Sequence, residues 1–251
     1  MLTRVKTAAE ITAMRESGRM LATVLHLLKT ETTPGINTKD LADKAQAELH
    51  HLGGQPAFLG YQGFPDVLCT SINDEVVHGI PHPSKIINEG DIVSLDFGVT
   101  YKGMITDGAL SFIVGKSKRP EHTELVKTTE QSMYAGIDVL QNGVHTGDIG
   151  EAVEGILNTH NYGIVRDLVG HGVGHYLHED PNIPNYGHKA TGTVLRSGMT
   201  VAIEPMATLG TYNVYVAQDG WTVLTSDKSW AAHFEHTVLI TDHGSEILTR
   251  L

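Results

Sequence analysis

The sequence predicts an α+β fold built from two similar halves that are related by an approximate two-fold axis. Residues 34–41 resemble residues 142–149, and residues 90–96 resemble residues 198–204, in both cases 108 positions later. Each half also combines helical periodicity with apolar, strand-like runs. Two segments that share one offset favour an internal duplication, although common loop and turn chemistry could produce the same similarity. We therefore expect a single domain over residues 1–251, with approximate repeats at 1–115 and 120–251.

The first half begins with two helices. Apolar residues recur at spacings of three and four over residues 11–28, which predicts an amphipathic helix that ends before Thr33-Pro34-Gly35. Thr38 is typical of the N-cap of a second amphipathic helix, which runs to about residue 52 and ends at Gly53-Gly54. The second repeat is expected to follow the same plan.

Antiparallel strands are expected after an irregular stretch, residues 54–64, that is rich in Gly, Pro and aromatic residues. The predicted strands are residues 67–72, 92–99 and 103–114, with Lys102-Gly103 as a turn between the last two. In each repeat an apolar strand ends in an acid, Asp96 in the first and Glu204 in the second. Because aspartate is unfavourable inside a strand, this symmetric placement suggests a site between the halves.

The composition of the chain limits which binding partners and which cellular compartment are expected. The formal charge of −11 argues against nucleic acid or an anionic membrane as the main partner, because phosphate binding needs clustered cations. The single cysteine, Cys69, excludes an internal disulfide and is typical of a reducing compartment. Residues 1–7 lack the apolar run of a signal peptide, and the apolar stretch 21–28 is too short to span a membrane. These features predict a cytoplasmic protein.

Five acidic and imidazole side chains form a candidate set of metal ligands: Asp96, Asp107, His171, Glu204 and Glu235. Asp96 and Asp107 flank the Lys102-Gly103 turn and are eleven residues apart. For both side chains to point to one site, the hairpin would have to pair unlike positions of its two strands or contain a bulge. His171 lies in a Gly-His-Gly-Val-Gly run that lets the backbone bring imidazoles close to a small ligand. Glu235 begins an apolar strand, where a carboxylate needs a cation or hydrogen-bond donors. Singly, each could be an ordinary turn, edge or strand-end residue.

Together, four carboxylates and one imidazole make a hard, oxygen-rich ligand set. Such a set suits Co²⁺, Mn²⁺, Fe²⁺ or Zn²⁺ better than a cysteine-rich structural zinc site does. Its negative charge is large enough to hold two divalent metal ions. Two ions that share a water lower the pKa of that water towards neutrality, which indicates hydrolase chemistry.

At these residues the chain resembles the type I methionine aminopeptidases of bacteria over essentially its whole length. The matching stretches are residues 69–81, 90–96, 170–174, 178–181, 198–205 and 234–237. The resemblance implies the pita-bread fold, in agreement with the repeat, and a single catalytic domain. It also implies removal of the N-terminal methionine from nascent proteins and peptides with a small second residue.

The resemblance further implies a role for each ligand. Asp96 would hold one metal ion, His171 and Glu204 the other, and Asp107 and Glu235 would bridge the two. A hydroxide that bridges the ions would attack the peptide carbonyl after the first residue of the substrate.

Three catalytic residues follow from the same resemblance. Glu204 would carry a proton towards the leaving amine, His178 would donate to the carbonyl oxygen, and His78 would contact the scissile amide nitrogen. The implied substrate-binding residues are Phe58, Tyr61, Phe64, Cys69, His78, His178 and Trp221. Without the resemblance, these aromatics would read as core packing. Cys69 has no evident base beside it, so a pocket wall is preferred to a nucleophile.

Some positions depart from the common pattern of these enzymes. Leu177 stands where an aromatic residue is usual, His175-Tyr176 replaces a small or basic pair, and Gly108-Ala109 differs from the frequent sequence after the second aspartate. These differences concern the shape of the pocket and the tolerance for substrates, and no ligand is lost.

Relatives with other activities offer alternatives. Aminopeptidase P, prolidase and creatinase usually carry a large domain ahead of the catalytic one, type II methionine aminopeptidases carry a long insert, and binding proteins of this fold typically lose ligands. The chain shows none of these features. The resemblance implies a monomer that acts on the N-terminal peptides of nascent proteins, leaves ribosome association open, and includes no nucleic-acid or membrane function.

Overall fold

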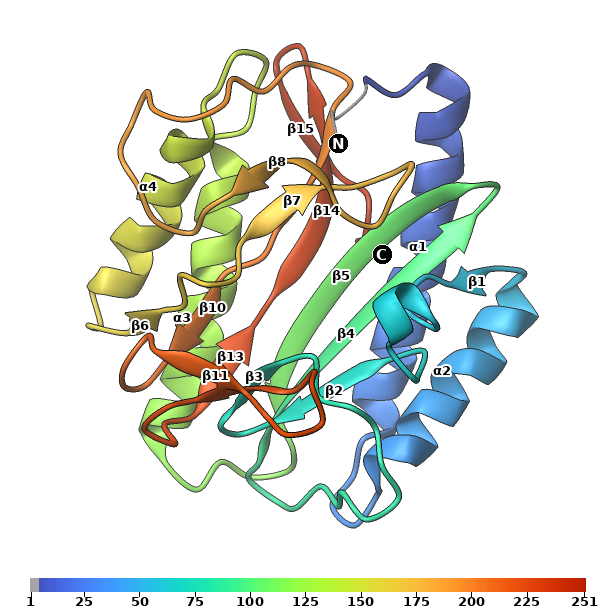
Figure 1. The fold of residues 1–251 in the computed structure, drawn as a ribbon, viewed down its shortest axis with the longest axis vertical. Helices are drawn as coiled ribbons and strands as arrows, with labels where there is room; N and C mark the ends of the chain where they lie inside the picture. The colour runs from blue at the N-terminus through green and yellow to red at the C-terminus, as the bar shows by residue number, and fades with distance from the viewer. Residues whose placement is uncertain (1–4) are drawn as a thin grey trace.

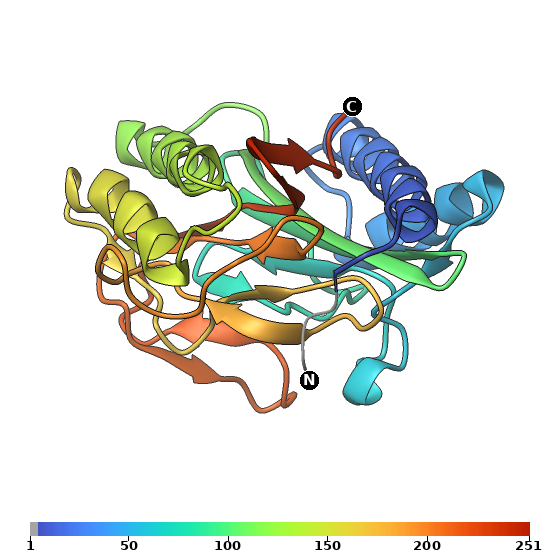
Figure 2. The ribbon, with the colours of Figure 1, turned by 90° about the horizontal axis from the view of Figure 1, so that it is seen from above.

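The structure is a computed structural model that describes residues 5–251. Four α-helices cover one face of a curved antiparallel sheet in this part of the chain (Figure 1). They are α1 (Ala8–Glu31), α2 (Thr38–Leu52), α3 (Pro120–Asp138) and α4 (Thr146–Asn158). Figure 2 shows that α1 and α2 form one pair and α3 and α4 a second pair, side by side on the same face of the sheet.

The main sheet contains nine strands within the described residues, in the order β1-β4-β5-β14-β9-β7-β8, with β2 paired to β4 and β15 paired to β14. Their bounds are β1 Gln55–Pro56, β2 Cys69–Ile72, β4 Ile92–Tyr101, β5 Met104–Ile113, β7 Gly170–Gly172, β8 Glu179–Ile183, β9 Thr200–Ile203, β14 Glu235–Thr241 and β15 Gly244–Ile247. The sheet is continuous from the first half into the second, because β5 pairs with β14.

Two small sheets lie beside this one, and the first of them packs against α3 and α4. One has the order β13-β10-β6 and the other β11-β12-β3. Their bounds are β3 Glu75–Val77, β6 Gly163–Ile164, β10 Met206–Thr208, β11 Val214–Val216, β12 Val223–Thr225 and β13 Ala231–His233. A short 3₁₀ turn, η1 (Tyr61–Gly63), lies between β1 and β2.

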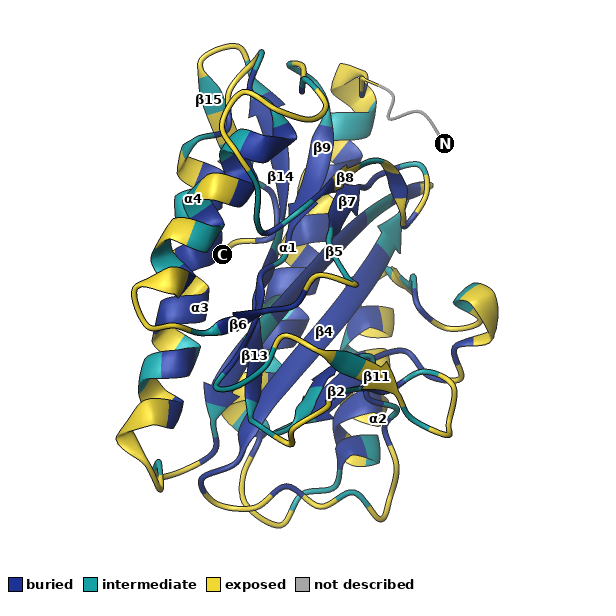
Figure 3. Cartoon of the chain, turned by 60° about the vertical axis from the view of Figure 1, so that its left-hand side comes forward, coloured by how far each residue is buried: buried dark blue, intermediate teal, exposed yellow. Residues whose placement is uncertain are grey.

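Each half has its own apolar core between its helix pair and the sheet. Val93, Leu95, Phe97 and Val99 of β4 pack against α1 and α2 in one cluster. A second cluster joins α3 and α4 to β9 and β14. Figure 3 shows β4 and β5 almost wholly buried, whereas the helices expose their outer faces. Because side chains alternate along a strand, Asp96 points to the face of the sheet opposite α1 and α2.

Equivalent turns recur at the offset of 108 seen in the sequence. Gly35 (φ 96°) donates its N–H to the Ile87 carbonyl at 2.8 Å, and Gly143 (φ 92°) donates to the Leu195 carbonyl at 2.9 Å. Isolated β-bridges join Asn37 to Ile86 and His145 to Val194, again at corresponding positions. The predicted α+β architecture of two similar halves is therefore what the chain adopts.

The start of α2 differs from the prediction by one residue. Asn37, not Thr38, is the N-cap, and its side chain accepts a hydrogen bond from the Asp40 N–H at 2.9 Å. Thr38 is buried, and its hydroxyl accepts from the His82 N–H at 2.9 Å. Both residues suit an N-cap, and the contact with residue 82 decides between them.

The β4–β5 hairpin corrects the expected register. Lys102 (φ 50°) and Gly103 (φ 78°) form a two-residue turn, and the ladder is regular from Tyr101↔Met104 to Ile92↔Ile113. Such a turn pairs residues that are an odd number apart, so of the two alternatives expected from the sequence the bulge is wrong. Asp96 faces Ala109, and Asp107 faces Gly98, which leaves the two aspartates as diagonal neighbours on one face.

Strand ends also differ slightly from the prediction, since β2 begins at Cys69 rather than residue 67. In residues 5–251, no helix has both the length and the apolar character needed to cross a membrane.

Candidate active site

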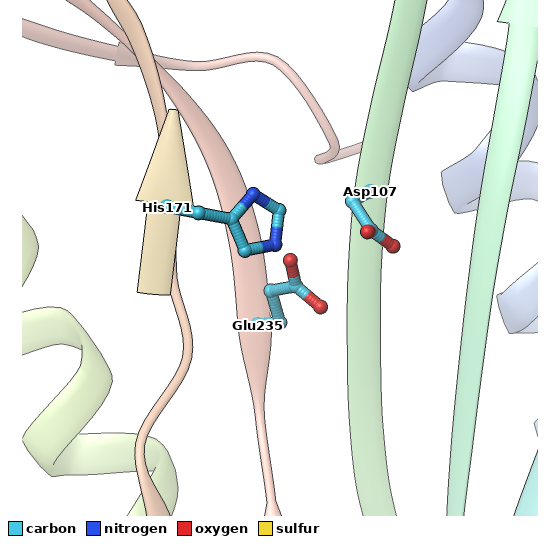
Figure 4. Close-up of side chains that lie close together, drawn as sticks. All are labelled: Asp107, His171 and Glu235. Carbon is cyan, nitrogen blue, oxygen red and sulfur yellow. The ribbon is translucent and has the colours of Figure 1, made fainter. Parts of the chain in front are cut away.

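The five predicted ligands come from both halves and meet on the face of the sheet away from the helices. Asp96 lies on β4, Asp107 on β5, His171 on β7 and Glu235 at the start of β14, while Glu204 directly follows β9. All five line one cavity of about 310 Å³. Figure 4 shows Asp107, His171 and Glu235 converging from three strands, and their ligand atoms lie within 4.8 Å of one another.

The register of three neighbouring strands explains this convergence. Ala109 of β5 pairs with Asp96 on one side and with Glu235 on the other. The side chains of paired residues point to the same face of a sheet. Residues that are two positions apart along one strand also share a face. Asp96, Asp107 and Glu235 therefore share one face, with His171 and Glu204 arriving from β7 and β9.

The carboxylates of this cluster are deeply buried. Asp96, Asp107 and Glu235 are 7%, 4% and 3% exposed. Desolvation raises the pKa of Asp107 to about 7. Desolvation, and then repulsion from the neighbouring carboxylates, raises the pKa values of Asp96, Glu204 and Glu235 well above their ordinary values. Without a bound cation, keeping these buried carboxylates ionised therefore costs a large amount of free energy.

Divalent cations fit this cluster. Asp96 Oδ1 and Glu235 Oε1 are buried and have no hydrogen-bond partner among the described residues. No Lys or Arg is among the described residues that line the cavity. Buried carboxylate oxygens without a donor are the groups that hard cations bind.

His171 is prepared to act as a ligand through Nε2. Its Nδ1 donates to the Gly172 carbonyl at 2.9 Å, since a carbonyl can only accept, and this leaves a lone pair on Nε2. Nε2 lies 3.3 Å from Glu204 Oε1. Burial lowers the pKa of His171 to about 3, so the imidazole is neutral, as metal binding requires.

One histidine at the site was not among the predicted residues. His233 Nε2 lies 3.7 Å from Glu204 Oε2, and its ligand atom lies within 4.8 Å of those of Glu204 and Glu235. Both ring nitrogens are buried without a hydrogen-bond partner in the described chain, and burial lowers the pKa to about 3. Its position two residues before Glu235 is the sequence signal that could have revealed it.

The seven predicted substrate-binding residues line the same cavity, together with Gln62 and Leu177. Phe64 and Trp221 meet edge to face at 5.1 Å, as do Phe58 and Phe64 at 6.5 Å. A Cβ on Gly98 would lie 2.6 Å from Phe58 Cε1, so this glycine lets the phenyl ring approach the sheet beside Asp107. The cavity therefore has one acidic wall and one aromatic wall.

Cys69 belongs to the apolar wall. It is 4% exposed and pairs with Asp96 across β2 and β4. Burial and the nearby aspartates raise the pKa of the thiol well above its ordinary value, which disfavours the nucleophilic thiolate.

His78 and His178 lie where the two walls meet. His78 follows β3 with a left-handed backbone (φ 59°), and burial lowers its pKa to about 4. His178 Nδ1 is 2.8 Å from the Tyr61 hydroxyl, and the two rings stack with centroids 5.4 Å apart. The His178 ring is also 4.2 Å from that of His171, and desolvation lowers the pKa of His178 although its edge is open to solvent. Both imidazoles are thus neutral hydrogen-bonding groups near neutral pH.

Comparisons with known proteins agree with this geometry. The family described as metallopeptidase family M24 matches residues 12–242. A methionine aminopeptidase from Clostridium acetobutylicum is 42% identical over 245 residues, which is 98% of each chain. The crystal structure of methionine aminopeptidase from Thermotoga maritima superposes with a TM-score of 0.98 at 43% identity and covers 100% of both chains.

A more distant structure shares the fold alone. Prolidase from Pyrococcus furiosus is 24% identical with a TM-score of 0.79, and the match covers 98% of this chain and 65% of that one. The pita-bread fold, implied by the resemblance, is confirmed by these structures. Full-length identity above 40% to the bacterial enzymes goes further than fold. The chain belongs to metallopeptidase family M24, among the bacterial methionine aminopeptidases.

Proposed function

We propose that the chain is a dinuclear-metal aminopeptidase that removes the N-terminal methionine from nascent proteins and peptides with a small second residue. The observation that carries this proposal is the cavity itself. Its acidic wall presents buried carboxylate oxygens that lack donors, and the rest of its lining includes aromatic side chains and a thiol. A soft, apolar pocket beside a metal centre suits a methionine thioether.

Two divalent ions, Co²⁺, Mn²⁺, Fe²⁺ or Zn²⁺, are the proposed cofactors. Asp96 would hold one ion, His171 and Glu204 the other, and Asp107 and Glu235 both. The bridging role of Glu235 is supported by its proximity to Asp107 and His171 on one side and to Glu204 and His233 on the other. His233 Nε2 lies 3.7 Å from a Glu204 oxygen, so its imidazole borders that proposed ligand.

When bound, such ions lower the pKa of a shared water and make hydroxide available as the nucleophile near neutral pH. The side chains of the chain provide the remaining functions. Glu204, whose pKa is raised by desolvation, is suited to accept a proton and pass it to the leaving amine. His78 would contact the scissile amide nitrogen, and the free amine of the substrate would lie near Asp96.

Tyr61 gives His178 the proton arrangement that this role needs. To donate to the substrate carbonyl, the neutral His178 ring must carry its proton on Nε2, so that Nδ1 accepts from the Tyr61 hydroxyl at 2.8 Å. The same contact holds the ring in place. Tyr61 is therefore proposed to orient a catalytic residue as well as line the pocket.

Replacing Tyr61 with phenylalanine tests this orientation. The ring and its stacking remain, and one hydrogen bond of about 1 kcal/mol is lost, so kcat should fall roughly fivefold to tenfold with little change in KM. Tyr215→Phe, at an exposed position, is the matched control. In a His178→Ala background the Tyr61→Phe change should have no further effect, and an undiminished effect there would disprove the link.

The substrate assignment is tested with two peptides. The protein is stripped with a chelator, reloaded with Mn²⁺ or Co²⁺, and offered Met-Ala-Ser and an X-Pro peptide. We expect release of methionine from Met-Ala-Ser in the reloaded protein alone. Preferential cleavage of X-Pro, or no methionine release with any metal, would contradict the proposal.

The proposed setting is the cytoplasm, at or near ribosomes, where nascent N-termini appear. The buried Cys69 thiol suits a reducing compartment. We propose that the chain acts as a monomer, because both halves of the ligand set come from one chain.

A further inference from the structure

We infer that Lys6 is a positioning residue for catalysis: through a buried ion pair with Glu179 it holds the β7–β8 loop (residues 173–178), which carries Leu177 and His178 into the cavity. This inference rests on the role proposed for His178. Figures 1 and 2 show the loop beside the chain that leads into α1. The ion pair joins residues 173 positions apart in the sequence.

Glu179 is the centre of this arrangement. Its Oε2 accepts from Lys6 Nζ at 2.8 Å, and the two side chains are 2% and 0% exposed. Its Oε1 accepts from the backbone N–H groups of His175 at 2.6 Å and Tyr176 at 3.1 Å. One carboxylate thus closes the loop on itself and attaches it to Lys6.

Lys6 is itself held firmly. Its backbone N–H donates to the Gly198 carbonyl at 2.8 Å. Its side chain crosses the loop at Gly174 (φ 147°), where a Cβ would lie 2.4 Å from Lys6 Cε. Gly174, in the Gly-rich run of the sequence, therefore provides the space through which the lysine reaches Glu179.

A second contact ties the same loop to the start of α1. Glu10 closes the capping box with Thr7 and accepts from His175 Nε2 at 2.8 Å. His175 is one of the residues that depart from the common pattern, and here it acquires a specific partner. Leu177 and His178 thus lie between two attachment points, at His175 and Glu179.

The ion pair does more than fasten the chain. Leu177 and His178, which directly precede Glu179, are among the described residues that line the cavity, whereas Lys6 and Glu179 are not. Buried ion pairs can often be replaced by apolar residues without loss of stability, because desolvation offsets their attraction. Such a pair beside a catalytic histidine is better explained by geometry, since small displacements of a reacting group cost large factors in rate.

The test compares two variants with a matched control. Lys6→Met leaves the buried Glu179 charge unpaired. Lys6→Met/Glu179→Gln removes both charges and keeps an amide oxygen for the His175 and Tyr176 N–H groups. Arg15→Met removes the exposed ion pair (2.7 Å) between Arg15 on α1 and Glu246 on β15, and is the control. Metal content, melting temperature, kcat and KM are measured on the metal-loaded full chain with Met-Ala-Ser.

We expect the double variant to recover the melting temperature and bind as much metal as the wild type, while its kcat stays at least about tenfold lower. Arg15→Met should retain the wild-type kcat. Recovery of kcat together with the melting temperature would overturn the positioning role. The double variant keeps the test decisive if Lys6→Met alone does not fold.

Hydrogen exchange separates this inference from the proposed function. The N–H groups of residues 175 and 176 should exchange faster in the double variant than in the wild type or Arg15→Met. This measurement needs no substrate. If the wild type released no methionine, the proposed function would fail, while hydrogen exchange would still report on the attachment of the loop to Lys6. Unchanged exchange in the double variant would overturn this attachment.

Discussion

Replacing Glu204 with glutamine is expected to reduce methionine release by at least about 10³-fold while the fold stays intact. Glu204, a proposed ligand, faces two neutral imidazoles, His171 at 3.3 Å and His233 at 3.7 Å. Glutamine keeps the shape of the side chain. It carries no negative charge to attract a cation, and it does not accept a proton. The loss should therefore appear in kcat with a substrate such as Met-Ala-Ser.

The control for this variant is Glu246→Gln, which removes an exposed carboxylate of similar size on β15. It should leave kcat unchanged. Metal content is measured on both variants, so that a lost ion is distinguished from a lost proton carrier. Turnover near the wild-type rate in Glu204→Gln would refute the role of this residue.

Asp107→Asn is expected to change stability in opposite directions with and without metal. Asp107 is 4% exposed, and burial raises its pKa to about 7. The folded state therefore binds this proton more tightly than the unfolded state does, and stability of the metal-free protein falls as pH rises from about 4 through about 7. An amide is never charged, so metal-free Asp107→Asn should melt above the metal-free wild type at pH 8.

The same substitution should abolish the stabilisation by Mn²⁺ and reduce activity at least about 10³-fold, because it removes a proposed bridging ligand. Thermal melts at pH 5 and pH 8, with chelator or with Mn²⁺, measure both effects. For a chain of this size each kcal/mol corresponds to about 2–4 °C. The gain in the metal-free state should shrink at pH 5. A variant that melts below the wild type in chelator at pH 8 would contradict the cost of the buried Asp107 charge.

The parts of this molecule that could be predicted from sequence are those that depend on local chemistry. The turns at Gly35 and Gly143 need a left-handed backbone, so they recur visibly at one offset. Acids that follow apolar runs are costly without a partner, which made the proposed ligand set recognisable, although β4 continues past Asp96 to Tyr101 and only Glu204 of the two follows the end of its strand.

The rest depends on register and on distant contacts. The Asp96–Asp107 geometry follows from a regular two-residue turn, whereas the separation of eleven residues by itself did not decide between a bulge and the pairing of unlike positions. The Tyr61–His178 contact joins residues 117 positions apart, and no periodicity signals it. His233 was overlooked because it lies at the end of β13, outside the strand that Glu235 begins. Leu177 proved to be buried in the aromatic wall, with Phe58, Phe64 and Cys69.

The most direct test of the metal centre is a titration of the chelator-stripped chain with Mn²⁺, in which bound ions per chain and the rate of methionine release are followed together. We expect two ions to bind the wild type, and binding to be weakened by Asp96→Asn and by Glu235→Gln, with activity following. Full activity with no Mn²⁺ bound, or saturation at a single ion in the wild type, would contradict a dinuclear centre shared by the two halves.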